Sequence, residues 1–285
     1  MNPDRLIDDA FAEHTGTPPP ALRGRIMAGA RRRRPVAPSY ALPYAVRIAV
    51  LDALLTELTP GEWATPVIYD WTVRDLVEHL GAVDEAVAEL LAGPLAANGQ
   101  AELDRRTAAA QSSTRSPDGT HRHWRDGAAA LCGALAGRPQ DLPTDLVLPL
   151  PLADLMTSRA FETWVHTTDI ADAVGRSLPP PLPEHLHPLA DLGVRLLPSA
   201  LSVATGAAAP ASAMITLDGP GGGTWTIALA PDAPLTPAFS LRLDVIDFCL
   251  LMGDRIPPSA LPVTITGDTL LARTLLEAAP ALSGP

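Results

Sequence analysis

The clearest pattern of polar and apolar positions lies between residues 156 and 170. At about 100° per residue, a helix here places four polar residues on one stripe roughly 80° wide: Arg159, Glu162, His166 and Asp169. Apolar residues border this stripe, Phe161 and Val165 on one side and Met156 and Ile170 on the other. A surface helix shows the reverse, a broad polar face opposite one apolar stripe. The pattern therefore predicts that the polar stripe faces inward, where unpaired charge is unfavourable.

Glu162 and His166 are four residues apart, so their side chains can reach one shared atom. A divalent metal ion is the simplest partner for a carboxylate oxygen and an imidazole nitrogen. The same spacing also occurs by chance on exposed helices, so the pair alone leaves an ordinary surface pair open.

The surrounding segment, residues 38–178, predicts four main helices with connections, which is the content of a four-helix bundle. We expect a loop with one weak helix over residues 93–120 and a linker over 143–151. The predicted helices run from Pro43 to Leu58, from a capping box at Thr72 and Asp75, from His121 to about Ala136, and from a cap at Asp154.

Three histidines of this segment differ in their predicted surroundings. His79 lies about 80° from the centre of the apolar stripe of its helix, where a metal ligand and a hydrogen-bonded boundary histidine fit equally well. His121 and His123 point apart at the start of a helix, so we interpret both as surface residues.

Residues 179–183 are nearly all proline and predict a domain boundary. Beyond it, residues 184–285 predict a small α+β domain. Its expected strands cover 213–217, 224–229, 240–245 and 261–266, and its helices cover 186–197, 246–252 and a segment after a cap at Asp268. The glycine run 219–223 predicts a hairpin turn, and His185 and His187 are expected to be solvated linker residues.

Residues 1–37 read as an N-terminal extension with short helices near 6–12 and 22–30. Arg31 to Arg34 are interpreted as a solvated helix end or tail rather than a nucleic-acid contact. The acidic start and the prolines after the arginines do not form a signal peptide, and no apolar run is long enough to span a membrane.

Composition narrows the chemistry. A net charge of −11 argues against nucleic acid or an anionic membrane as the main partner. The chain has no lysine, which excludes Schiff-base catalysis and phosphate binding by a P-loop. Two cysteines, Cys132 and Cys249, suit a reducing cytoplasm, and their apolar surroundings favour structural roles.

Three sequence blocks match a known family: Leu58 to Pro66, Trp71 to Leu80, and Glu162 to Asp169. They resemble the mycothiol-dependent maleylpyruvate isomerase family of DinB-like metalloenzymes. Gly253 to Arg255 and Pro262 to Asp268 resemble its second domain, whose fold is similar to that of sterol-carrier proteins. The resemblance covers roughly residues 40–280.

The resemblance implies a DinB-like four-helix bundle that holds a divalent metal, usually zinc, through His79, Glu162 and His166. Arg159 and Asp169 would orient the ligands, and we assign Asp169 to the catalytic set. The implied activity uses mycothiol for cis-trans isomerisation or thiol transfer on a small carboxylate substrate. Arg255 is our candidate for holding that carboxylate, with a plain surface arginine as the alternative.

Two other functions stay open. The same scaffold could support a metal-assisted reaction without a thiol, in a specialised biosynthetic pathway, or it could be a non-catalytic bundle that binds a ligand or partner. Many relatives carry Cys-Pro-Gly immediately before the tryptophan, whereas this chain has Ile68, Tyr69 and Asp70. This departure leaves the implied metal ligands in place, but the resemblance then does not define the substrate. The sequence also leaves the oligomeric state open.

Overall fold

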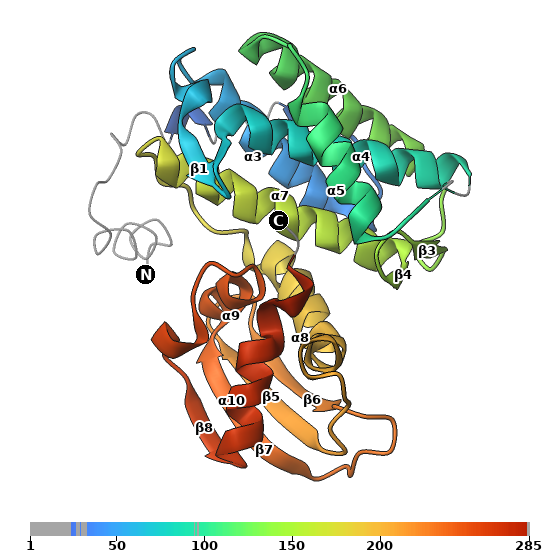
Figure 1. Ribbon diagram of the computed structural model, residues 1–285, viewed down its shortest axis with the longest axis vertical. Coiled ribbons are helices and arrows are strands. Elements are labelled where there is room, and N and C mark those ends of the chain that lie inside the picture. The colour runs from blue at the N-terminus through green and yellow to red at the C-terminus, as the bar shows by residue number, and fades with distance from the viewer. Residues whose placement is uncertain (1–23, 27–28, 30–32, 94, 96, 284–285) are drawn as a thin grey trace. The chain divides into compact units, whose positions relative to one another are not determined.

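The computed structural model describes residues 24–26, 29, 33–93, 95 and 97–283. The chain has the predicted mixed α/β content and divides into two compact units, residues 1–179 and 180–285 (Figure 1). The helix expected near 6–12, most of the one near 22–30, and Arg31 and Arg32 lie outside the described residues.

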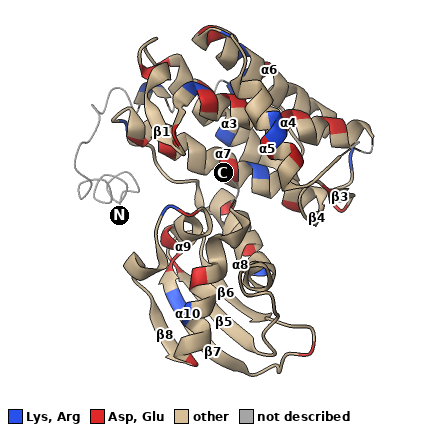
Figure 2. Ribbon diagram, viewed as in Figure 1, with Lys and Arg blue, Asp and Glu red and all other residues tan. Residues whose placement is uncertain are grey.

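The first unit is mainly helical. Its helices are α3 (Leu42–Thr56), α4 (Val73–Ala92), α5 (Gln100–Gln111), α6 (Pro117–Ala134) and α7 (Leu152–Ala173). Helix α3 packs against α6 and α7, and α4 packs against α5, α6 and α7. Short elements complete the unit: η1 (Ser39–Ala41), η2 (Glu62–Ala64), the hairpin β1 (Pro66–Ile68) and β2 (Trp71–Thr72), and the hairpin β3 (Pro143–Asp145) and β4 (Pro149–Pro151). Figure 2 shows acidic and basic residues interspersed along these helices.

Helix α3 supplies much of the core of this unit. By length and composition, one segment of the described residues, Ser39–Thr56, could cross a membrane. In the structure, 72% of that window is buried inside the protein. A core helix of a soluble protein meets the same criteria, so the apolar character of α3 is explained by its packing.

The start of α4 is fixed as the sequence predicts. The backbone N–H of Asp75 donates to Thr72 Oγ1 at 3.3 Å, and the backbone N–H of Thr72 donates to Asp75 Oδ2 at 3.0 Å. Both halves of the capping box are therefore present. This cap fixes where α4 begins. Within the helix, His79 lies in the interior, with only 5% of the residue exposed.

Other predictions for the first unit were wrong in detail. Helix α6 begins at Pro117, four residues before His121, because Ser116 caps it and proline suits the first helical position. The expected linker 143–151 contains the β3–β4 hairpin. Helix α7 begins at Leu152, so Asp154 lies in its first turn and is not its cap. The weak helix expected within 93–120, by contrast, is confirmed as the 12-residue helix α5.

The surface positions expected for two basic groups also need correction. His121 is only partly exposed, and its Nε2 lies 2.7 Å from Asp52 Oδ1 on α3. Arg33 is not simply solvated, because it donates to Thr56 Oγ1 at 2.6 Å and lies 3.4 Å from Asp52 Oδ2. His123, by contrast, lies at the surface as expected, partly exposed and paired with Glu85 at 3.0 Å.

The second unit is a four-stranded sheet with helices on one face (Figure 1). Its elements are α8 (Pro183–Thr205), β5 (Ser212–Asp218), β6 (Gly223–Ala228), β7 (Pro237–Asp244), α9 (Val245–Met252), η3 (Pro258–Ala260), β8 (Thr264–Gly267), α10 (Thr269–Ala278) and η4 (Ala279–Leu282). The strand order is β6-β5-β7-β8, with β5 and β7 parallel and the other pairs antiparallel. Alternate residues of β5 and β7 are buried beneath the helices: Ala213, Ile215, Leu217, Phe239, Leu241 and Leu243.

The predicted hairpin and the Asp268 cap are confirmed, since β5 pairs with β6 and Asp268 Oδ1 accepts from the backbone N–H of Leu271 at 3.0 Å. Helix α8 is longer than expected, because Pro198 lies inside the helix and does not end it. The linker prediction for His185 and His187 was wrong. Both lie on α8; His185 is buried, and exposed His187 stacks on Trp225. Strand β8 begins at Thr264, three residues later than predicted.

Candidate metal centre

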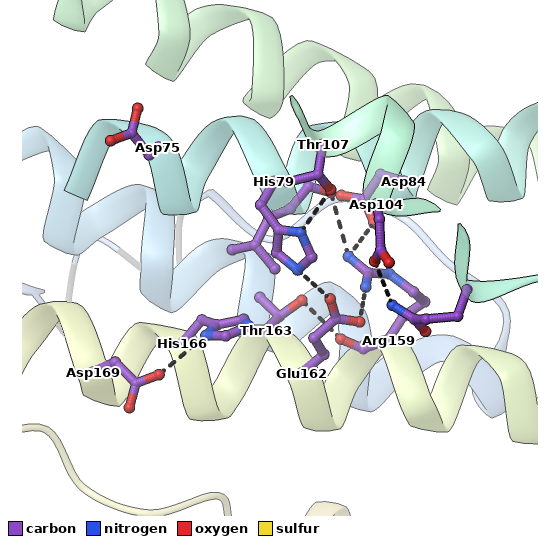
Figure 3. A network of polar contacts seen from close by, with 12 residues as sticks. Asp75, His79, Asp84, Asp104, Thr107, Arg159, Glu162, Thr163, His166 and Asp169 are labelled. Carbon is purple, nitrogen blue, oxygen red and sulfur yellow. Dashed lines mark hydrogen bonds and ion pairs between the residues drawn. The ribbon is translucent and has the colours of Figure 1, made fainter. Parts of the chain in front are cut away.

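Helices α4 and α7 bring together three side chains with metal-binding atoms. In the part of the chain that the structure describes, His79, Glu162 and His166 form the one such group, with one ligand atom from each lying within 4.8 Å of the others. Figure 3 shows His79 reaching from α4 toward Glu162 and His166 on α7. The two histidines are buried, and Glu162 keeps partial exposure. The inward stripe predicted for α7 is therefore correct.

Both nitrogens of His79 have partners. Its Nε2 lies 2.9 Å from Glu162 Oε1, and its Nδ1 lies 2.9 Å from Thr107 Oγ1 on α5. The His166 ring meets it edge to face, with ring centroids 5.4 Å apart. On the other side of His166, Nδ1 lies 3.0 Å from Asp169 Oδ2. Thr107 and Asp169 therefore each hold one imidazole by its Nδ1.

Arg159 connects this group to the core. The residue is 1% exposed, and its guanidinium donates to Asp84 Oδ1 from Nη2 at 2.9 Å and from Nε at 3.1 Å. Its Nη1 donates to Glu162 Oε2. The two oxygens of Glu162 thus have different neighbours, Arg159 at Oε2 and His79 at Oε1.

Burial and pairing set the protonation of the ligands. Burial by itself raises the pKa of Glu162, but the Arg159 guanidinium and the hydrogen bond to His79 outweigh it and hold that pKa well below its usual range. Burial lowers the pKa of His166 despite its hydrogen bond to Asp169, which raises it. At neutral pH the pair is a carboxylate and a neutral imidazole, the forms that bind metal ions.

Aromatic rings border the site on the side of His79. The Trp71 ring lies 5.2 Å from the His79 ring, and the Tyr69 ring lies 5.8 Å from that of Trp71, centroid to centroid. Tyr69 and Asp70 form the β1–β2 turn with φ of 55° and 62°, so both adopt the left-handed conformation. These two residues and Ile68 before them stand where many relatives carry Cys-Pro-Gly.

Three other residues singled out from the sequence are not part of this cluster. Arg255 belongs to the second unit, where its Nη1 donates to the carbonyl oxygen of Gly253. Cys132 and Cys249 are buried, and burial raises the pKa of both thiols, that of Cys132 to about 12. Such thiols are poor nucleophiles, in agreement with the expected structural roles.

Sequence reasoning missed two residues of the site. Asp84 follows Leu80 by four residues and therefore lies on the inward face of α4. A carboxylate among apolar neighbours on that face was the available signal that Asp84 is a buried partner of Arg159. Thr107 gave no such signal, because a threonine on a polar, weakly predicted helix has no pattern that points to His79.

The chain is similar to known proteins in both sequence and fold. Residues 45–171 match the family model described as the mycothiol maleylpyruvate isomerase N-terminal domain. An uncharacterized protein of Mycobacterium tuberculosis, found in two strains, is 30% identical over 246 residues, which cover 82% of this chain and 91% of the relative.

Among solved structures, the crystal structure of the mycothiol-dependent maleylpyruvate isomerase is similar in fold. It has a TM-score of 0.53 at 14% identity and covers 83% of this chain and 92% of that one. A histidine-to-alanine mutant of that enzyme gives the same TM-score at 13% identity, covering 82% and 92%.

Proposed function

The chain belongs to the mycothiol maleylpyruvate isomerase family, and from this premise we propose a metal-dependent enzyme that uses a low-molecular-weight thiol on a small carboxylate substrate. The observation that carries the proposal is the convergence of His79, Glu162 and His166 within 4.8 Å, with both imidazoles buried. We also propose that residues 38–178 form a DinB-like metal-binding bundle and that residues 184–285 form a domain of the sterol-carrier type.

The donor set fits a divalent ion. Two imidazoles and one carboxylate suit zinc and leave a fourth position for a ligand, as in catalytic rather than structural sites. Charge supports the same assignment, because the carboxyl groups of Asp84, Glu162 and Asp169 lie in and beside the cluster and two of them share Arg159. That guanidinium holds Glu162 ionised, the form that binds a cation.

The chain's own residues would prepare this site. Asp169 and Thr107 hold the two imidazoles by Nδ1, which leaves each ring to bind through Nε2. Arg159 keeps Glu162 ionised. When bound, the metal would lower the pKa of a coordinated thiol and so supply a thiolate near neutral pH.

The reaction that this family implies needs no further cofactor. The thiolate would add to one carbon of an activated cis double bond, which turns the carbon–carbon bond into a single bond. After rotation about that carbon–carbon bond, elimination would break the carbon–sulfur bond and give the trans isomer and the thiolate. In a transferase the thiol adduct is released instead. We propose that Arg255 binds a substrate carboxylate, since a guanidinium matches its geometry. The thiol would be kept reduced in the cytoplasm, the location we propose.

Metal analysis tests the first half of the proposal. We expect about one zinc ion per purified chain and its loss in His79→Ala. His123→Ala is the matched control, because that histidine pairs with Glu85 outside the cluster and its removal should leave the metal content unchanged. A wild-type protein that is isolated without metal and takes up no added zinc would contradict the proposal.

Calorimetric titration of the zinc-loaded protein with mycothiol tests the second half. Binding that disappears in His79→Ala would support a thiol ligand at the metal. Absence of binding at millimolar mycothiol eliminates the thiol version and leaves a metal-assisted reaction without a thiol. Several small carboxylate substrates should be tested for turnover. The reason is that Tyr69 and Asp70 in the β1–β2 turn replace the residues that many relatives carry next to Trp71.

A further inference from the structure

The two carboxylate oxygens of Glu162 are not equivalent in this structure. Oε1 lies 2.9 Å from the Nε2 of His79, one of the two imidazoles in the metal cluster. Oε2 accepts a hydrogen bond from Arg159 Nη1 and faces the core. A carboxylate can bind a metal through one oxygen or through both, and the partner of the second oxygen decides between these modes.

Arg159 is held firmly in place. Its Nε and Nη2 both donate to Asp84 Oδ1, and Nη2 also lies 3.3 Å from the carbonyl oxygen of Leu80. The guanidinium is planar, so these bonds from α4 also fix the direction of Nη1. Releasing Glu162 Oε2 would therefore require either rotation of Glu162 or the loss of bonds between Arg159 and α4 (Figure 3).

We infer that Arg159 is a positioning residue that restricts Glu162 to a single metal-binding oxygen. This inference rests on the proposed function and goes beyond it, because it assigns the coordination number. Three donors, one from each residue, leave an open position on a four-coordinate ion. A Glu162 that bound through both oxygens would fill that position or crowd the ligand that must enter it.

Cobalt(II) in place of zinc reports this directly, because a four-coordinate cobalt ion has an intense visible absorption band and higher-coordinate cobalt a weak one. We expect the intense band in the wild-type protein and in Asp84→Asn, whose amide oxygen can still accept from Arg159. In the double variant Asp84→Asn/Arg159→Met, which removes both buried charges together, the band should lose most of its intensity as Oε2 joins the ion.

An intense band that persists in the double variant would overturn the inference and leave Arg159 a structural role only, visible as a lower melting temperature. A wild-type protein that takes up no cobalt would instead remove the proposed metal function itself, so the two failures are distinguishable. If the double variant does not fold, a crystal structure of the zinc-loaded wild-type chain decides. The inference requires Oε1 on the metal and Oε2 on Arg159, and it fails if both oxygens bind the ion.

Discussion

Two buried polar clusters in the helical unit use the same residue types in different ways. The metal cluster consists of His79, Glu162 and His166. The second, which we call the Asp52 cluster, consists of Asp52 on α3, His121 and Arg125 on α6, and Arg33. Asp52 Oδ1 lies 2.7 Å from His121 Nε2, and Oδ2 lies 3.2 Å from Arg125 Nε and 3.4 Å from Arg33 Nη1.

The difference lies in how the donor atoms are distributed. In the Asp52 cluster one carboxylate is surrounded by a histidine and two arginines, so each oxygen already has a cation or N–H partner. In the metal cluster two imidazoles and one carboxylate each place a ligand atom within 4.8 Å of the others, and His79 contacts one oxygen of the carboxylate. The comparison teaches that a histidine–carboxylate contact becomes a candidate metal site only when a second neutral donor faces the same point.

The largest effect should come from removing a ligand of the metal cluster. We expect His166→Ala to lower zinc affinity by more than the 10- to 100-fold typical of changes to residues that orient a ligand. Competition with a chelator measures this. His121→Ala is the matched change in the Asp52 cluster and should leave zinc affinity as it is. Equal losses in both variants would break the distinction between the clusters.

The Asp52 cluster should instead contribute to stability. Asp52→Ala leaves His121 and two arginines without their shared carboxylate, and we expect a loss of about 3 kcal/mol in the free energy of unfolding. This is the low end for a broken buried pair, because Arg33 and Arg125 keep contact with solvent. Urea unfolding measures the loss. A metal content that fell with Asp52→Ala would argue against separate roles.

The difference in unfolding free energy between the wild type and Asp52→Ala should become smaller in acidic solution. Burial raises the pKa of Asp52, but His121, Arg125 and Arg33 outweigh it and hold that pKa below its ordinary value. The carboxylate therefore stabilises the fold fully above its unfolded pKa of about 3.9, and this contribution is lost as pH falls through the folded pKa. The gap between wild type and Asp52→Ala should be constant from about pH 7 to 5 and close in more acidic solution.

Patterns within single elements were enough to predict much of this unit. The stripe of Arg159, Glu162, His166 and Asp169 follows from helical geometry alone, and the capping box at Thr72 sets where α4 begins. Both are local features, fixed by residues three or four positions apart. In the second unit, the β5–β6 hairpin was predictable for the same reason.

Contacts between distant segments could not be read in this way. Thr107 meets His79 across 28 residues and His121 meets Asp52 across 69, and neither pair has a spacing that shows it. The end of helix α8 was predicted wrongly for a different reason. Pro198 reads as a helix end, yet the helix continues because its buried residues on both sides of the proline pack into the core of the second unit.

The negative charge of Asp169, which lies next to His166, should matter more for zinc affinity than the shape of the Asp169 side chain. Asp169→Asn keeps an oxygen for His166 Nδ1 but removes the negative charge, and we expect about a tenfold loss of zinc affinity. Asp172→Asn, at an exposed position one turn further along α7, is the control and should change affinity little. A loss in both variants would indicate a general effect of charge on the helix and not the specific contact with His166.

The smallest effect should come from the contact that α5 makes. Thr107→Val keeps the shape of the side chain and removes the hydroxyl beside His79 Nδ1, so one hydrogen bond of about 1 kcal/mol is lost, equivalent to about a fivefold loss in zinc affinity. Thr163→Val is the control, because its hydroxyl bonds the carbonyl oxygen of Arg159 within α7. If only Thr107→Val weakens binding, then α5 takes part in setting the imidazole for the metal. If neither does, α5 only covers the site, and His79 is oriented by Glu162 and the Trp71 ring alone.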